Sequence, residues 1–325
     1  MSELEIIAIL SSIMLQATPL IIAVCGEVIT ERVGIVNLSL DGSMLMSAMT
    51  GFVVGLKTGS VILGFLAAAA VGAFFALIVA YGSIRLKQSQ FAIGFVLTLL
   101  GDDLSAFLGQ NYTRIPGPSV AKWGIPFLKD LPFGIGAIFF DQNPVVYFAL
   151  LLVVLVWWWF NYTQPGLRLR AVGERPEAAF ARGVKINFTR YLYTLIGGAL
   201  VGIAGASYSF SVKLYWSEGH TRGYGWIALA IVIFGGWSPV KGMLGALIFG
   251  ATKAVATILQ HTFPEVSVVA FNALPWILMI IVLVLVGSDL SEWLVALVPK
   301  RYQNRLRSLL RVDAPQALGV NFGEK

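Results

Sequence analysis

Four ionisable side chains interrupt long apolar runs of this sequence: Asp41, Asp102, Asp103 and Lys253. A charged group at the centre of a membrane helix costs about 3 kcal/mol on insertion scales. Such residues therefore pair with one another, or they line a water-filled cavity. The chemistry that they suggest is ion pairing and the binding of polar solutes or ions, rather than bond cleavage.

Asp102 and Lys253 lie at similar depths in their apolar segments. Each lies about 11 to 13 residues after the start of its apolar segment, a distance of roughly 17–20 Å along a helix. We therefore expect Lys253 to pair with Asp102 or Asp103 between two helices. Such a pair would either fix the register of the helices or form a polar lining of a solute pathway, and both interpretations stay open.

The segment from Glu27 to Gly42 is too polar for a plain membrane span and too apolar for a solvated loop. A broken or re-entrant helix would satisfy its backbone against protein rather than lipid. Its side chains Asn37, Ser39 and Asp41 alternate with apolar ones, and discontinuous helices often form binding sites inside membranes. We expect these three side chains to face a solute pathway; the alternative is that Asp41 caps a buried helix by accepting a backbone N–H.

Catalytic and metal chemistry have little support in this sequence. The single cysteine excludes a disulfide framework, and two histidines exclude a His-rich metal centre. The HExxH and GxSxG patterns of hydrolases are absent, and so is the GxxxxGK[ST] phosphate loop. We therefore predict no enzyme activity, no metal and no cofactor in this chain, so any dependence on ATP must come from another protein.

The composition indicates that lipid is the solvent for most of the chain. Hydrophobic residues make up 57% of the 325 residues and charged residues 12%, the latter about half the share in an average soluble domain. The predicted fold is all-α, a polytopic membrane protein with about 8–10 transmembrane helices, some of them broken or re-entrant. We count about nine apolar segments, at roughly 6–26, 33–56, 61–84, 91–109, 144–161, 190–212, 223–237, 240–262 and 266–287.

More than half of the 23 basic residues lie in two polar stretches, at 162–190 and 289–325. The positive-inside rule places both stretches in the cytoplasm. The side of the N-terminus stays open, because nine simple crossings would put it outside, whereas a re-entrant segment would put it inside. We thus predict one transmembrane domain over 1–288, with a cytoplasmic loop at 162–190, followed by a basic cytoplasmic tail over 289–325.

The cytoplasmic loop contains the pattern of a short helix. Gly173 ends one element, Pro176 suits the first turn of the next, the alanines after it are strong helix formers, and Gly183 suits a C-terminal stop. A basic loop resting on anionic lipid is one interpretation of this stretch. The pattern consists of Gly173, Glu174, Pro176, Glu177, Ala178, Ala179 and Gly183.

The order of these residues supports a more specific interpretation. Gly-Glu-x-Pro-Glu-Ala-Ala, followed by Gly-Val, resembles the coupling loop of ABC importer permeases of the branched-chain amino acid, ribose and nucleoside superfamily. Residues 31–46 resemble the early motif of the nucleoside and simple-sugar permeases, with Asp41 where glutamate is more typical. The runs 224–230 and 234–242 are similar to the late region of that family.

This resemblance implies a permease subunit that works by alternating access in the cytoplasmic (inner) membrane of a bacterial-type cell. A separate ATPase would bind ATP and Mg²⁺ and would dock on the short helix through the seven residues of its pattern. The other partners implied are an extracytoplasmic solute-binding protein, a second permease subunit, as a paralogue rather than a second copy, and membrane lipid; no nucleic acid is expected.

The early motif favours a nucleoside, with a simple sugar, a branched-chain amino acid or an amide as alternatives. The expected pathway residues are Asn37, Ser39, Asp41, Asp102, Trp226 and Lys253.

An ion-coupled secondary transporter is the competing hypothesis. Asp41 or Asp102 would then bind the driving ion, and the chain would transport its solute without an ATPase. This hypothesis predicts uptake by the chain alone under an ion gradient.

Overall fold

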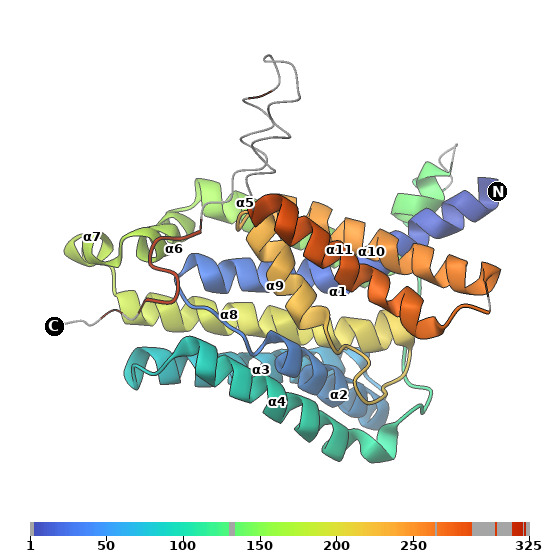
Figure 1. Ribbon diagram of the computed structural model, residues 1–325, viewed down its shortest axis with the longest axis horizontal. Coiled ribbons are helices and arrows are strands. Elements are labelled where there is room, and N and C mark those ends of the chain that lie inside the picture. The colour runs from blue at the N-terminus through green and yellow to red at the C-terminus, as the bar shows by residue number, and fades with distance from the viewer. Residues whose placement is uncertain are drawn as a thin grey trace.

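Every regular element is a helix in the computed structural model, among the residues that it describes, which are 3–129, 134–263, 265–287, 303, 314–320 and 322. Figure 1 shows long helices that run roughly along one direction. The α-helices are α1 (Glu3–Arg32), α2 (Leu40–Thr58), α3 (Val61–Ala80), α4 (Gln90–Gly109), α5 (Pro144–Tyr162), α6 (Gln164–Glu174), α7 (Pro176–Ala181), α8 (Ile186–Ser207), α9 (Tyr224–Phe234), α10 (Pro239–Thr262) and α11 (Val268–Gly287). Short π-helical or 3-10 turns cover Tyr81–Arg85, Gln110–Tyr112, Gly136–Phe140 and Tyr208–Lys213.

Six helices of the described part are long and apolar enough to cross a membrane: α1, α3, α4, α5, α8 and α10, with the adjoining π or 3-10 turns counted for α3, α4 and α8. The helices α9 and α11 are apolar but contribute shorter apolar stretches, and α2 carries Asp41 and Lys57 near its ends. The predicted all-α polytopic membrane fold is therefore confirmed.

The centre of the bundle is formed by α1 and α8. On one side α8 packs against α2 and α3, with α4 beyond α2; on the other, α1 packs against α10 (Figure 1). Side chains of α1 such as Ile22 and Val28 are completely buried. The two central helices approach each other very closely, since a Cβ atom at Gly26 would lie 2.6 Å from the carbonyl oxygen of Gly197. Small residues allow such close packing of helices in lipid.

The chain breaks between α1 and α2, although not at the residues that the sequence suggested. The expected second segment, 33–56, is helical only from Leu40, and the polar residues from Glu27 to Arg32 belong to the continuous helix α1. Gly34 has φ +94°, and the amides of Gly34 and Ile35 donate to the carbonyls of Glu31 and Thr30. This left-handed glycine cap ends α1, so residues 33–39 re-enter the bundle without helical structure.

Two helices consequently begin inside the bundle. Gly42, in the first turn of α2, faces Gly101 near the middle of α4. Gly225, in the first turn of α9, lies against the backbone of Asp41 so closely that a Cβ atom would overlap it. The starts of α2 and α9 thus meet about halfway along α4.

Candidate functional site

The loop between α5 and α8 folds into the helices α6 and α7 at one end of the bundle, opposite the start of α1 (Figure 1). The hydroxyl of Thr163 accepts the amide of Gly166 and caps α6. Pro176 occupies the first turn of α7, and Gly183, with φ +81°, follows its end. The predicted short helix is therefore present. It presents exposed side chains at Glu177 and Ala178, whereas Ala179 is buried.

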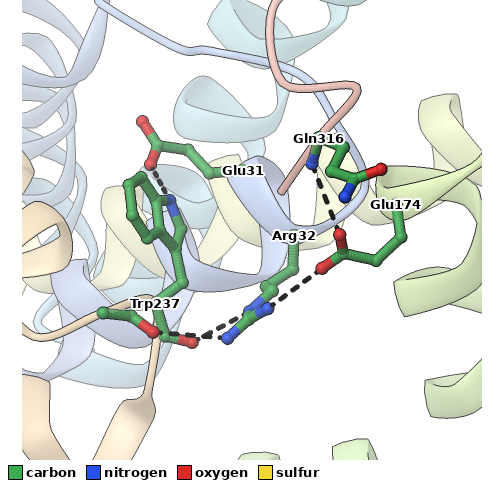
Figure 2. Close-up of polar contacts among 6 residues, drawn as sticks. Glu31, Arg32, Glu174, Trp237 and Gln316 are labelled. Atoms are coloured by element: carbon green, nitrogen blue, oxygen red, sulfur yellow. Dashed lines mark hydrogen bonds and ion pairs between the residues drawn. The ribbon is translucent and has the colours of Figure 1, made fainter. Parts of the chain in front are cut away.

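Arg32 connects this loop to a turn that is remote in sequence (Figure 2). Its guanidinium lies 3.6 Å from a carboxylate oxygen of Glu174, at the end of α6. It also donates to the carbonyl oxygens of Trp237, at 3.1 Å, and Gly236, at 3.3 Å, in the turn between α9 and α10. The indole of Trp237 in turn donates to the carboxylate of Glu31. Three segments that are distant in sequence thus share one polar cluster.

The sequence interpretation missed the role of Arg32 and Trp237. Both lie within the stretches that carried the family resemblance, 31–46 and 234–242. Their contact joins residues 205 positions apart. Position in a motif was therefore the signal available for these two residues, because no local pattern pairs them.

Asn37 and Ser39 turn into the protein. Both side chains are buried, and the amide oxygen of Asn37 accepts the backbone N–H and the hydroxyl of Ser39. The backbone N–H of Asn37 donates to Glu27 at 3.3 Å. Within this chain these polar groups are used to hold the non-helical segment 33–39 in place.

Asp41 joins the starts of two helices. One of its carboxylate oxygens accepts the backbone N–H groups of Gly223, at 2.8 Å, and Gly225, at 2.9 Å. These are orphan donors at the start of α9, where a negative charge also complements the helix dipole. In this geometry Asp41 is a helix cap, but for a helix that lies more than 180 residues later in the chain.

The predicted ion pair between Lys253 and Asp102 or Asp103 is wrong. Asp102 pairs instead with Arg222, whose guanidinium lies 2.8 Å from the carboxylate, and Asp103 is exposed on α4. The ammonium group of Lys253 lies over the ring of Tyr224, 5.7 Å from its centroid. Equal depth does not bring side chains together, because it ignores the direction in which each points around its helix.

The connection 214–223 leads to the start of α9 inside the bundle, and so brings Arg222 beside Asp102, near the middle of α4. The Arg222 side chain is 56% exposed and that of Asp102 29%. Trp226 is partly buried and packs against the core. The structure thus gathers Asp41, Asp102, Trp226 and Lys253 around the start of α9, but not Asn37 and Ser39 on an open face.

His220 is partly buried in the same connection. Its ring stacks on Tyr208, with centroids 5.3 Å apart, and its Nε2 atom lies 3.2 Å from the hydroxyl of Ser209. Burial lowers the pKa of His220 from 6.5 to about 4, helped by the charge of Lys213 and opposed by a backbone hydrogen bond to Ser217. His220 is therefore neutral at neutral pH.

This pKa predicts a loss of stability in mild acid. Above pH 6.5 His220 is neutral in both the folded and unfolded states, and its full contribution to stability is present. As the pH falls from 6.5 towards 4, the unfolded state binds a proton that the folded state excludes, so stability decreases. Thermal unfolding of the detergent-purified protein at pH 4.5 and 7.5 measures this. The variant His220→Gln should show a smaller difference between the two pH values; an equal difference would contradict the assignment.

Among the described residues, no group of three or more His, Cys, Asp or Glu side chains is placed to hold a metal ion. The basic tail residues that supported the predicted orientation lie outside the described residues. They are Lys300, Arg301, Arg305, Arg307, Arg311 and Lys325.

The chain is similar in sequence to known proteins over most of its length. Residues 9–285 match the permease component family of branched-chain amino acid transport systems. A putative glucose ABC transporter permease protein, TsgC13 of Haloferax volcanii, is 39% identical over 76% of each chain. No solved structure matches the chain.

Two further relatives are named for nucleosides. The nucleoside ABC transporter permease protein NupC of Lactococcus lactis is 33% identical over 85% of this chain and 91% of its own. The guanosine ABC transporter permease protein NupQ of Bacillus subtilis is 34% identical over 86% of this chain and 93% of its own. A second permease of the same organism also matches in two cases: TsgB13 in Haloferax volcanii and NupB in Lactococcus lactis.

Proposed function

The chain belongs to the permease component family of branched-chain amino acid transport systems, and from this premise we propose that it is the membrane-spanning subunit of an ATP-driven importer for a nucleoside or a related small polar solute. Relatives named as nucleoside, guanosine and glucose permeases support this class of solute. A simple sugar is the next candidate, followed by a branched-chain amino acid or an amide. The chain itself performs no catalysis, and ATP with Mg²⁺ binds to a separate ATPase.

The observation that carries this proposal is the arrangement of α7. This short helix presents Glu177 and Ala178 at one end of the bundle, as a docking element for another protein must. Its neighbour Glu174 is connected through Arg32 to the turn before α10. A force applied to α7 by an ATPase therefore has a direct route into the transmembrane helices.

The solute pathway in this proposal runs beside the start of α9. Asp102 and Arg222 form a partly exposed ion pair about halfway along α4. Lipid does not accommodate exposed charges at that depth, so this face contacts water or a second protein. We assign Asp102, Arg222 and Lys253 to the pathway face, and Asp41 to the support of α9.

The remaining parts of the importer follow from the same proposal. A second permease subunit completes the pathway, and the paired permeases of Haloferax volcanii and Lactococcus lactis support a paralogue. An extracytoplasmic protein delivers the solute. The α7 end of the bundle and the C-terminal segment face the cytoplasm of a bacterial-type cell, which places the start of α1 outside.

Co-purification with the cognate ATPase tests the proposal. We expect the intact chain to retain the ATPase and Ala178→Arg to weaken the complex about tenfold, equivalent to about 1.4 kcal/mol, because a long charged side chain then occupies the docking surface. Ala121→Arg makes the same change at an exposed alanine at the other end of the bundle and should leave binding unchanged. Solute uptake by this chain alone under an ion gradient would overturn the proposal in favour of a secondary transporter.

A further inference from the structure

A short C-terminal segment, residues 314–320 and 322, returns to the α7 end of the bundle. It is internally folded, since the amide of Leu318 donates to Pro315 at 3.0 Å and that of Val320 to Ala317 at 3.2 Å. Gly319 has φ +74°, a conformation that favours glycine. Ala317, at its centre, is only 6% exposed. The segment is therefore a compact turn with a buried centre, not a loosely attached end.

Two backbone hydrogen bonds join this turn to two other parts of the chain. The amide of Ala317 donates to the carbonyl of Gly173 in α6, at 2.9 Å. The amide of Gly319 donates to the carbonyl of Gly34, at 3.1 Å, where the non-helical segment 33–39 begins. A Cβ atom at Gly34 would lie 3.0 Å from the carbonyl oxygen of Ala317. The turn thus fills the space between α6 and the segment that leads to Asp41.

Side chains add a third and a fourth attachment. Arg190, at the start of α8, is 2% exposed and donates to the carbonyl of Val320 at 2.9 Å. The ring of Phe322 lies 6.0 Å from that of Phe180, in α7. Figure 2 shows Gln316 beside Glu174, to which its backbone N–H donates at 3.4 Å. The segment therefore contacts α6, α7, α8 and the end of α1 together.

We infer that residues 314–320 and 322 form a C-terminal brace, which fixes the α6–α7 loop to segment 33–39, so that a movement of α7 is transmitted to the starts of α2 and α9. This inference rests on the proposed function, because α7 is taken as the docking element for the ATPase. The Arg32–Glu174 pair alone is a weak connection, because it is partly exposed and its nitrogen and oxygen atoms lie 3.6 Å apart. The brace adds backbone hydrogen bonds, which hold a fixed geometry.

Hydrogen exchange of the purified permease, without any ATPase, tests the brace itself. Ala317→Glu would put a carboxylate where the turn is buried, and should displace it. We expect the amides of residues 173–184 to exchange about five- to tenfold faster, because α6 and α7 lose a fixed neighbour. Val320→Glu makes the same charge change at an exposed side chain and should leave exchange unchanged. Equal exchange in both variants and in the original protein would overturn the inference.

A cross-linking measurement covers the case in which Ala317→Glu does not fold. Cysteines in place of Phe180 and Phe322 should be joined by a short bismaleimide in the otherwise unchanged chain, whose native Cys25 is completely buried. Absence of this cross-link in the folded double variant would overturn the inference.

The functional consequence is measured in the reconstituted importer with its ATPase and solute-binding protein. Ala317→Glu should retain the ATPase but lower solute uptake per ATP hydrolysed about fivefold or more, whereas Val320→Glu should behave as the original protein. Unchanged uptake per ATP in Ala317→Glu would contradict transmission through the brace. If the original chain binds no ATPase, the proposed function fails, and hydrogen exchange still decides whether the brace exists.

Discussion

Asp41→Ala is expected to abolish solute uptake. The substitution removes the only carboxylate that accepts the amides of Gly223 and Gly225 in the described structure. Each buried N–H left without an acceptor costs about 1–3 kcal/mol, so the start of α9 should detach from α2. Asp41→Asn keeps an acceptor oxygen at nearly the same place, and should retain a substantial part of uptake and most of the thermal stability.

Uptake in the reconstituted importer, together with thermal unfolding of each variant, measures this effect. Ser43→Ala is a matched control, because Ser43 is buried in the same turn of α2 and its hydroxyl makes no hydrogen bond within the described residues. Normal uptake in Asp41→Ala would exclude the cap as a requirement for transport. Stable but inactive Asp41→Asn would show that the charge itself is required, as in the pathway interpretation.

Arg32→Ala is expected to lower solute uptake about ten- to a hundredfold while the ATPase remains bound. Arg32 makes charged hydrogen bonds to the carbonyls of Gly236 and Trp237, and bonds of this kind contribute about 1.5–3 kcal/mol each. The ion pair with Glu174 is longer, at 3.6 Å, and Glu174 is 43% exposed, so it contributes about 0–1 kcal/mol. Glu174→Gln should consequently lower uptake only a few-fold.

Simultaneous measurement of ATP hydrolysis and uptake separates loss of docking from loss of transmission. In Arg32→Ala, hydrolysis should continue while uptake per ATP falls. Arg32→Lys keeps the positive charge but lacks the planar guanidinium group, which can reach two carbonyls and a carboxylate together. Its uptake should therefore lie between that of Arg32→Ala and that of the original protein. A Glu174→Gln variant that loses more uptake than Arg32→Ala would contradict the ranking of these contacts.

Local patterns were sufficient for much of the architecture. The apolar segments expected at 61–84, 91–109 and 144–161 correspond to helices α3, α4 and α5 within a few residues. A segment in lipid must satisfy its backbone N–H and C=O groups internally, and a helix does so. The short helix from Pro176 and its stop at Gly183 were predicted equally well. Proline and glycine act through their own φ angles, which do not depend on distant residues.

The pairing of polar groups could not be predicted in this way. Depth alone suggested Lys253 as the partner of Asp102, but the structure supplies Arg222, 120 residues from Asp102, because the connection before α9 descends into the bundle. Asp41 caps α9 through hydrogen bonds to residues that lie 182 and 184 positions later in the chain. Side-chain direction around a helix, and the path of a non-helical connection, are set by packing against other helices.

The amino-acid sequence therefore determined the membrane-embedded helical fold, the short helix α7 and membership of the permease family, since these depend on composition and on local order along the chain. Only the tertiary structure decided how the few polar residues are used: Asp41 as a cap for α9, Asp102 as the partner of Arg222, and Arg32 as the link between Glu174 and Trp237. The physical reason is that a buried polar group must find a partner, and which partner is within reach depends on how the whole chain packs.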